Sequence, residues 1–493
     1  MAAPVPLNKL NKLDQIDPAE AWKPWAPTAA DPWDHKWAAH LYRRAAFGAS
    51  GAELAQAVTS GHAATLDLLL EGQPKSADLV ATLNDVGRVA ATRDAAGNEL
   101  RGWWLYCMLQ GGHPLREKLT LFWHNHFATS IAKVQNTKLM FSQNATFRAH
   151  ALGKFGPLLH AITRDPAMLL WLDSNTNVKG KPNENYAREL MELFSLGVGN
   201  YTEKDVREAA RAFSGWHTDG SGFKFNAAQH DDGTKTVLGK TGPWDGDAVV
   251  KLVLDQPACA RFLVRKLYTF FVSEVPPPAR LLEPLCDSFR KSGYDTAALM
   301  KTILGSRHFY SAFAFRKRIK SPVEYALGAV LATYRRYEER DAHFRPLAHQ
   351  QLVKWLTGMG QILFAPPNVK GWPGSRTWLN TATVLERDNF AEALASGALW
   401  LPPVEQQLFV VSGDLPPPKA LDPARVLDED KATKPADVVR VLLDQYVPGG
   451  VRSDAQEKLV AFVEEGAPTG LQLARRARGA AHAILTMPEA QLC

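Results

Sequence analysis

The stretch "LREKLTLFWHNHF", residues 115–127, indicates the fold class of this chain. Its apolar residues recur at three- and four-residue spacing, as they do on one face of an α-helix. His126 shares that face with Phe122 and Trp123. His124 lies about 200° from His126 around a helix, from the ~100° step per residue, so the two cannot bind one ion unless the helix ends between them. The structural alternative to a site is a core helix in which His126 is hydrogen-bonded and His124 is partly exposed.

The same helical spacing recurs along most of the chain, and no alternation of strands with helices suggests a Rossmann-like sheet. Clear examples are residues 52–72, 98–110, 260–274, 321–340 and 388–401. Residues 215–242 differ, because they are rich in glycine and polar residues. Within them "FKFN" and "KTVLG" surround the turn signal "DDG" and predict one β-hairpin. We therefore expect a mainly α-helical fold, with a large multi-helical body and a small β-hairpin insertion.

The length of 493 residues suffices for a large core or for two to three domains. Prolines near the start predict an extended N-terminal arm over residues 1–30, followed by the main helical domain over 31–400. Residues 401–436 are rich in proline and charge and are expected to form a linker or to lie along the surface. Residues 437–493 show helical patterns again, which predicts a C-terminal group of helices.

Composition excludes several classes of protein. Hydrophobic residues make up 46% and charged residues 22%, which is typical of a soluble globular protein. The net charge of +6 comes without a dense Lys/Arg tract, so no nucleic-acid partner is expected. No run reaches the ~18 apolar residues that a membrane span needs. The start of the chain lacks the apolar segment of a signal peptide. We therefore expect export to the periplasm or the outside if a signal has been removed, and a cytoplasmic protein otherwise.

A polar loop between two predicted helices has the spacing of a calcium site. Asp173, Asn175, Asn177 and Glu184 occupy positions one, three, five and twelve of an EF-hand-type loop. Position six, however, is Val178 instead of glycine. Calcium or another divalent metal is one interpretation, and an Asn-rich turn held by side-chain to backbone hydrogen bonds is the other.

The helix after this loop carries most of the candidate chemistry. Its carboxylates and arginine recur every three to four residues, which predicts either a pocket wall or a ladder of exposed salt bridges. Two carboxylates one turn apart could hold a single metal ion together with a histidine. The predicted catalytic residues are His126, Glu184, Tyr186, Arg188, Glu189 and His230, and the alternative metal ligands are Glu189, Glu192 and His126.

The segment "GWPGSRTW", residues 371–378, is stiffened by proline and opened by glycine. A rigid aromatic loop of this kind either packs against the body or binds a ligand. The predicted substrate-binding residues are Trp372, Arg376, Trp378 and Asn380.

Five stretches together resemble a bacterial family known as domain of unknown function 1800. They are "HLYRRAAFGAS", "LREKLTLFWHNHFATS", "KPNENYARELMELFSLGVGNYTEKDVREAARAFSGW", "HDDGTKTVLG" and "FAPPNVKGWPGSRTWLNTAT". The resemblance runs from about His40 to Phe390. It implies an exported protein whose gene adjoins that of a sulfatase-like protein, which is therefore a possible partner. Phe194 stands where many members carry a histidine after "ELMEL", which weakens a di-metal interpretation here.

Three functions remain open on the sequence. The first is an enzyme acting on a polar polymer such as a glycan, either by acid–base hydrolysis with a carboxylate pair or by β-elimination from a uronate. The second is a metal-dependent enzyme with one ion held by carboxylates and histidine. The third is a non-catalytic helical partner of an exported enzyme. The relative positions of four residues discriminate best among them: His126, Glu184, Glu189 and His230.

Overall fold

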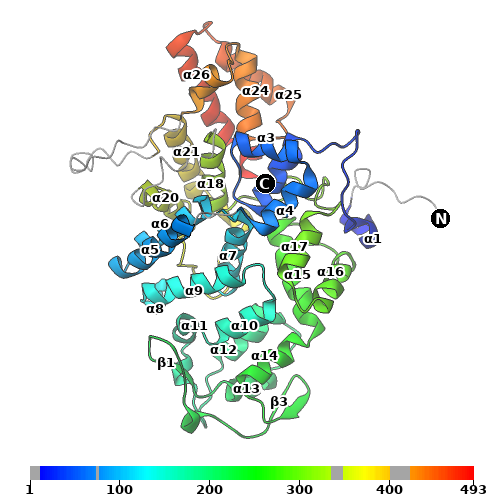
Figure 1. Cartoon of the computed structure of the whole chain (residues 1–493), viewed down its shortest axis with the longest axis vertical. Helices are drawn as coiled ribbons and strands as arrows, with labels where there is room; N and C mark the ends of the chain where they lie inside the picture. The colour runs from blue at the N-terminus through cyan, green and yellow to red at the C-terminus, as the bar shows by residue number, and fades with distance from the viewer. Residues whose placement is uncertain (1–11, 74–76, 111, 335–347, 400–421) are drawn as a thin grey trace, which may run out of the picture.

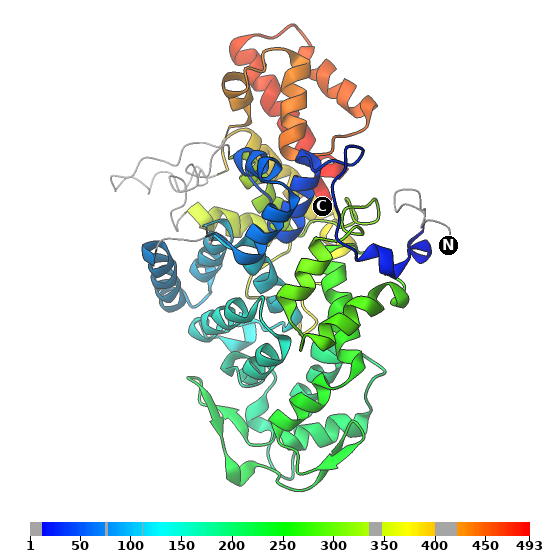
Figure 2. The ribbon, with the colours of Figure 1, turned by 45° about the vertical axis from the view of Figure 1, so that its right-hand side comes forward.

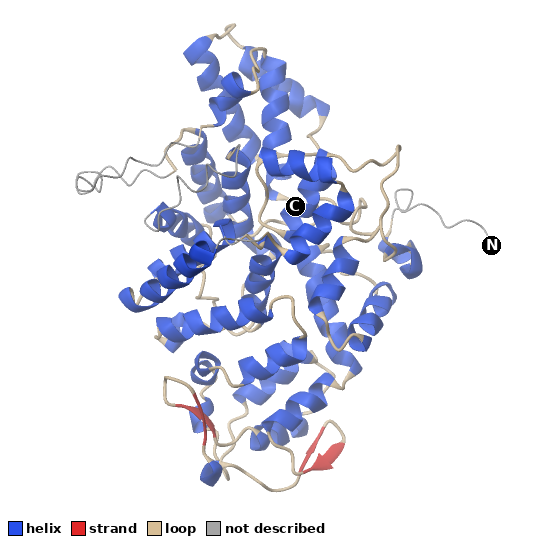
Figure 3. Ribbon diagram, viewed as in Figure 1, coloured by secondary structure: helices blue, strands red, loops and turns tan. Residues whose placement is uncertain are grey.

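The computed structural model describes residues 12–73, 77–110, 112–334, 348–399 and 422–493. Helices dominate it, and two small antiparallel two-stranded sheets are the only strand pairs in the described ranges (Figure 3). The predicted mainly helical fold is therefore confirmed. The described helices include none that is long and apolar enough to cross a membrane.

A first apolar core joins the N-terminal helices to the helices of the middle of the chain (Figure 1). It is built largely from α1 (Pro18–Ala21), α2 (His35–Ala45), α3 (Gly51–Ser60), α4 (His62–Glu71), α7 (Pro114–His126), α10 (Phe155–Thr163), α13 (Glu203–Ala212), α14 (Gly246–Leu254), α15 (Pro257–Phe271), α16 (Ala279–Lys291) and α17 (Thr296–Leu304). It also includes α12 (Asn185–Glu189), which continues into the π-helical turn η4 (Leu190–Ser195).

A second apolar core holds the remaining helices. They are α5 (Ala77–Arg93), α6 (Asn98–Gln110), α8 (Ile131–Val134), α18 (Pro322–Thr333), α20 (Ala348–Gly358), α21 (Thr381–Ala395), α23 (Val426–Glu429), α24 (Pro435–Tyr446), α25 (Ser453–Glu464) and α26 (Gly470–Thr486). Two helices, α9 (Thr137–His150) and α11 (Pro166–Trp171), contribute to both cores. Because α26 packs against α21 and α24, the C-terminal helices are continuous with this core.

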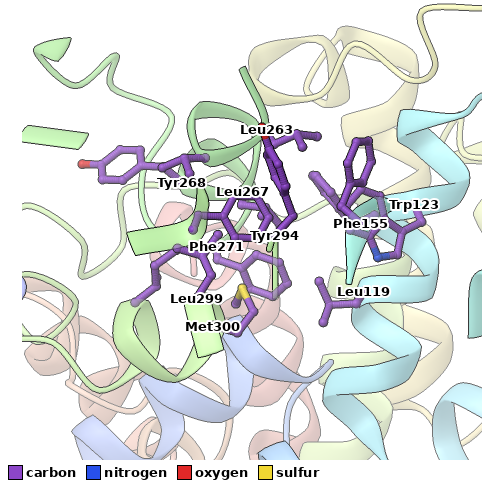
Figure 4. Packing of buried hydrophobic residues seen from close by; sticks show 14 of the residues in the cluster. Leu119, Trp123, Phe155, Leu263, Leu267, Tyr268, Phe271, Tyr294, Leu299 and Met300 are labelled. Carbon is purple, nitrogen blue, oxygen red and sulfur yellow. The ribbon is translucent and has the colours of Figure 1, made fainter. Parts of the chain in front are cut away.

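Helix α7 is buried on nearly all sides, which explains why its sequence is apolar beyond one face. Figure 4 shows its Leu119 and Trp123 in one apolar cluster with Leu263 and Leu267 of α15. The indole N–H of Trp123 donates to the carbonyl of Ala151 at 3.1 Å, so this buried polar atom is satisfied. The helix runs between the two cores, since Leu119 belongs to the first and its neighbour at 121 to the second.

The insertion contains two hairpins instead of the single predicted one. Strand β1 (Trp216–Thr218) pairs with β2 (Phe223–Phe225), and β3 (Lys235–Val237) pairs with β4 (Lys240–Gly242). "FKFN" and "KTVLG" are therefore not partners, and "DDG" is not their turn. The Asp231 carboxylate instead accepts from the Gly233 backbone N–H at 3.0 Å, which forms a local turn. The insertion lies at the opposite end of the molecule from the C-terminal helices (Figures 1 and 2).

Two predicted segments are only partly described. In the N-terminal arm, residues 12–30 contain η2 (Leu13–Gln15) and α1, and the indole of Trp22 donates to the carbonyl of Leu281 at 2.6 Å. Most of the predicted linker falls on residues 400–421, which lie outside the described residues. Its last part forms η7 (Pro423–Arg425) and α23, and α24 already begins at Pro435. The domain boundaries themselves remain a prediction.

Candidate functional site

A cleft with polar and aromatic walls lies where the two cores meet. Its walls come from the end of α7, the exposed side of α15, and the loop at residues 370–378, and its volume is about 560 Å³. Phe122 of α7 and Phe270 of α15 approach each other to 5.3 Å between ring centroids. Trp372 and Trp378 close the opposite wall.

Asn125 in "WHNHF" fixes the loop wall of this cleft. Its Oδ1 accepts the backbone N–H of Trp372 at 2.7 Å. The preceding residue, Gly371, has φ +82°, and a Cβ there would come within 2.2 Å of Asn125 Oδ1. The loop can approach α7 only because this position is glycine. The resulting contact joins the two motifs that stood out in the sequence.

His126 is buried and its tautomer is fixed. Its Nε2 lies 3.0 Å from the carbonyl oxygen of Phe194 in η4. Because a carbonyl only accepts, Nε2 carries the proton and Nδ1 is left as an acceptor. Nδ1 is buried and has no hydrogen-bond partner among the described residues. Burial, and then the charge of Lys266, lower the pKa of His126 well below its usual value, so this histidine is neutral.

His124 is not the partly exposed residue that the structural alternative predicted. Only 1% of its surface is exposed, and its ring packs against Trp104, Phe364 and Trp372. Burial lowers the pKa of His124 to about 3. The helix places it in the second core, whereas His126 faces the first, so the two histidines do not form one site.

Positive side chains dominate the cleft. Its lining includes four cations and one carboxylate, Glu274, a formal balance of +3. Arg318 is paired with Glu324 at 3.0 Å. The other three cations make no ion pair within the described part of the chain; they are Arg265, Lys266 and Lys370. Unpaired cations around a cleft attract anions.

Among the cations of the cleft, Lys266 lies near the neutral His126. Its ammonium sits 5.2 Å from the ring centroid of Phe262, one turn earlier on α15. Burial lowers the pKa of Lys266 to about 8. Arg265 and Lys266 are not among the site residues predicted from the sequence. The signal was present, because a basic pair interrupts the apolar run of residues 260–274.

The predicted catalytic residues on α12 do not line this cleft. The hydroxyl of Tyr186 donates to Thr163 Oγ1 at 2.7 Å, and burial raises the pKa of that phenol. Arg188 pairs with Glu184 at 3.0 Å and with Glu203 at 2.7 Å. Glu184, Arg188 and Glu203 thus form surface salt bridges, as the structural alternative predicted, whereas Tyr186 is buried.

Glu189 is half-buried outside the cleft lining. Burial and then the nearby Glu192 raise its pKa, while Arg188 and Lys370 act in the opposite direction. Glu192 accepts a hydrogen bond from the Tyr201 hydroxyl at 3.0 Å. The described residues hold no group of three or more His, Cys, Asp or Glu that could bind a metal ion. The metal set of Glu189, Glu192 and His126 is therefore not assembled.

The predicted calcium loop is a compact polar turn. Asn175 exchanges two hydrogen bonds with the backbone of Thr218, its Oδ1 accepting at 2.8 Å and its Nδ2 donating at 2.9 Å. Asn177 Oδ1 accepts the backbone N–H of Asn183 at 3.0 Å. Asp173 pairs with Lys133 at 2.8 Å, and Glu184 with an arginine. Each candidate ligand residue thus uses its side-chain oxygen on a protein donor.

The remaining predictions divide between the insertion and the loop. His230 lies in the insertion, where its Nδ1–H donates to the carbonyl of Ser214 at 2.8 Å. Trp372 and Trp378 do line the cleft, although they are 6% and 7% exposed. Asn380 caps α21, with its Oδ1 accepting from the Thr383 N–H at 3.1 Å. Arg376 is exposed and lies outside the cleft lining.

Comparison with known families agrees with the resemblance of the five motifs. The sequence profile described as "Protein of unknown function (DUF1800)" matches residues 40–492. The chain belongs to the DUF1800 family. The match includes both sides of the cleft and continues through the C-terminal helices, beyond the stretch over which the motifs were recognised. No curated protein and no solved structure matches the chain.

Proposed function

We propose that this DUF1800 protein is an enzyme that binds an acidic glycan in the basic cleft between α7, α15 and the loop at residues 370–378. The observation that carries the proposal is the set of three cations without ion-pair partners in the described structure, on two sides of one cleft. A carboxylated or sulfated sugar would supply the missing negative charges. Charge-assisted hydrogen bonds of this kind are about twice as strong as neutral ones.

The walls favour a sugar polymer over other anions. Aromatic and backbone surfaces near Phe122, Trp372 and Trp378 offer apolar contact between the charged positions. The cleft volume of about 560 Å³ lies within the ~300–1,000 Å³ usual for a ligand pocket, which is room for a short segment of a sugar chain. A nucleic acid is less well matched, because the net charge is only +6 and no basic tract extends the cleft.

The lining also bears on the reaction. Hydrolysis by a carboxylate pair needs two acids across the scissile bond, whereas Glu274 is the one carboxylate among the described lining residues. β-Elimination from a uronate needs cations to neutralise the sugar carboxylate and a base to remove the neighbouring proton. The C–O bond to the leaving sugar then breaks and its oxygen takes a proton. The described lining supplies the cations that elimination needs and only one of the two carboxylates that hydrolysis needs, which favours elimination.

Ligand specificity tests the proposal. Binding of polygalacturonate, dextran sulfate, neutral dextran and single-stranded DNA would be measured by titration calorimetry at low and moderate salt. We expect an acidic glycan to bind, more weakly as salt rises, and neutral dextran not to bind. DNA binding tighter than that of both acidic glycans would contradict the glycan assignment.

The reaction is assayed separately on the bound polymer. Elimination creates a conjugated double bond that absorbs in the ultraviolet, whereas hydrolysis creates reducing ends without that absorbance. Binding with neither product would contradict the enzymatic part of the proposal and leave a binding protein.

A further inference from the structure

We infer that Lys266 is a nucleophilic amine and that the cleft forms a covalent imine at this residue with an anionic aldehyde. The inference rests on the proposed function only in using the same cleft. It adds a chemically reactive group and a ligand class, a carbonyl compound that carries negative charge.

The geometry separates Lys266 from an ordinary surface lysine. Its ammonium contacts the face of Phe262, and no carboxylate in the described structure pairs with it. It lines the cleft, so a ligand can reach it. The face of Phe262 attracts the ammonium weakly, as aromatic rings do. Desolvation without a carboxylate partner is the arrangement that activates a lysine amine as a nucleophile.

His126 supplies an independent observation. Its proton is fixed on Nε2 by the Phe194 carbonyl, so the buried Nδ1 lone pair has no donor. The histidine is close enough to Lys266 for the lysine charge to lower its pKa. A neutral imidazole does not stabilise an ammonium as a carboxylate would. His126 therefore leaves the charge of the Lys266 ammonium uncompensated.

The charged groups that line the cleft do not account for the lowered pKa of Lys266. Those that line it with Lys266 are His126 from α7, Arg265 from the same helix, Glu274 and Arg318 from the segments after α15 and α17, and Lys370 from the loop. Burial is the cause of the lowered pKa of Lys266, which is about 8. A substantial fraction of this amine is therefore neutral near neutral pH.

The reaction balances without a further reagent. The ammonium of Lys266 loses one proton, and the neutral nitrogen attacks the carbonyl carbon to form a C–N bond. The nitrogen then gives its second proton to the oxygen. The oxygen also takes back the proton first released and leaves as water, which yields the protonated imine. The neighbouring cations bind the negative group of the ligand and hold its carbonyl near the nitrogen.

Pyridoxal 5′-phosphate is a suitable probe, because it joins an aldehyde to a phosphate. Borohydride adds hydride to the imine carbon and fixes the label, and peptide mapping by mass spectrometry then locates it. The reference residue is Lys251, which is exposed on α14. At pH 7.5 the neutral fraction at Lys266 exceeds that of an ordinary lysine by about a hundredfold. We expect at least about tenfold preferential labelling, since nucleophilicity falls with pKa.

The pH profile requires no variant. Labelling of Lys266 should rise through pH 8 and then level off, whereas an ordinary lysine continues to gain reactivity toward its pKa of ~10.4. Lys266→Arg keeps the charge and should abolish the label at this peptide, while Lys251→Arg leaves labelling of Lys266 unchanged. Melting curves would verify that both variants fold.

The outcomes separate this inference from the proposed function. Equal labelling of Lys266 and Lys251, or a profile that still rises well above pH 8, would overturn the nucleophile even if acidic glycans bind. Selective labelling without glycan binding would support the nucleophile and overturn the proposed function.

Discussion

The side-chain oxygen of Asn125 accepts the backbone N–H of Trp372 at 2.7 Å, across 247 positions of the chain. This hydrogen bond connects the end of α7 to the aromatic loop and so brings together the two walls of the cleft. It answers the question that the "WHNHF" motif raises. Asn125 organises the loop, His126 faces the first core beside Lys266, and His124 is packed in the second core.

Gly371→Ala should destabilise the protein by about 2–4 kcal/mol, because it adds both backbone strain and a clash. The new Cβ would lie 2.2 Å from Asn125 Oδ1 and 2.5 Å from the Asn125 carbonyl oxygen. Gly180→Ala is the matched control, since Gly180 has φ +81° but no atom within 4 Å of its Cβ position. Urea unfolding would compare the two. Equal losses of unfolding free energy would show that the contact with Asn125 contributes nothing.

Glu324→Gln should cost about 3–5 kcal/mol of unfolding free energy. Glu324 is buried and pairs with Lys118 at 2.6 Å and with Arg318 at 3.0 Å, so the substitution leaves two buried cations uncompensated. Burial opposes its ionisation, but the two cations outweigh burial and lower its pKa. The pair therefore stabilises the fold at neutral pH and loses this effect as the pH falls below the unfolded value of ~4.3.

The exposed ion pair of Glu283 with Arg261, at 3.0 Å, provides the control for this substitution. Glu283→Gln should change the unfolding free energy by no more than about 1 kcal/mol. Chemical denaturation at pH 7 measures both variants. A loss at Glu324 as small as that at Glu283 would contradict the role given to the buried cluster.

Asp165→Asn should stabilise the protein at pH 8 by about 1–3 kcal/mol and have little effect at pH 4. Asp165 caps α11, accepting from the Met168 N–H at 2.9 Å and from Gln143 at 2.7 Å. Burial raises its pKa to about 7, although these hydrogen bonds oppose the rise. A raised carboxyl pKa means that the native state favours the protonated form. The contribution of Asp165 to stability is therefore full below pH ~3.9 and is lost as the pH rises through 7.

Thermal melts of wild type and variant across that pH window test this prediction. Asp245→Asn makes the same exchange at an exposed N-cap, that of α14, and separates the effect of cap chemistry from that of burial. A wild type that is more stable than Asp165→Asn at pH 8 would contradict the raised pKa.

Glu189→Gln distinguishes the site predicted from sequence from the cleft. Glu189 lies outside the cleft lining, so we expect the variant to fold and to keep its affinity for polygalacturonate within about twofold. Lys370→Gln, in the lining, should weaken the same binding about threefold to tenfold. Calorimetric titration of both variants gives the comparison. Loss of binding in Glu189→Gln with none in Lys370→Gln would restore the α12 residues as the site.

The helical fold was predictable because periodicity is a local property, and α7 begins with Pro114 and ends at His126, as the pattern indicates. Strand pairing was not, since "FKF" pairs with residues 216–218 and not with "KTV". Trp372 and Trp378, which the sequence predicts to bind substrate, line the cleft, and their binding role stays a prediction. The sequence missed Lys266, because an amine in an amphipathic helix reveals its burial only when α7 and the loop pack against it. The sequence pattern favoured Arg188 as a catalytic residue, because its ion-pair partner Glu203 lies 15 residues away and is not apparent from local spacing.

Affinity for polygalacturonate in two triple variants of equal charge tests the central claim most directly. The cleft variant removes the three cleft cations that have no ion pair in the described structure, by Arg265→Gln, Lys266→Gln and Lys370→Gln. The surface variant removes three exposed charges on α14, α16 and α20, by Lys251→Gln, Lys291→Gln and Lys354→Gln. Both sets lower the formal net charge from +6 to +3. The account predicts that the cleft variant loses affinity at least about a hundredfold and the surface variant no more than about threefold. Equal losses in the two variants would contradict a specific site in the cleft.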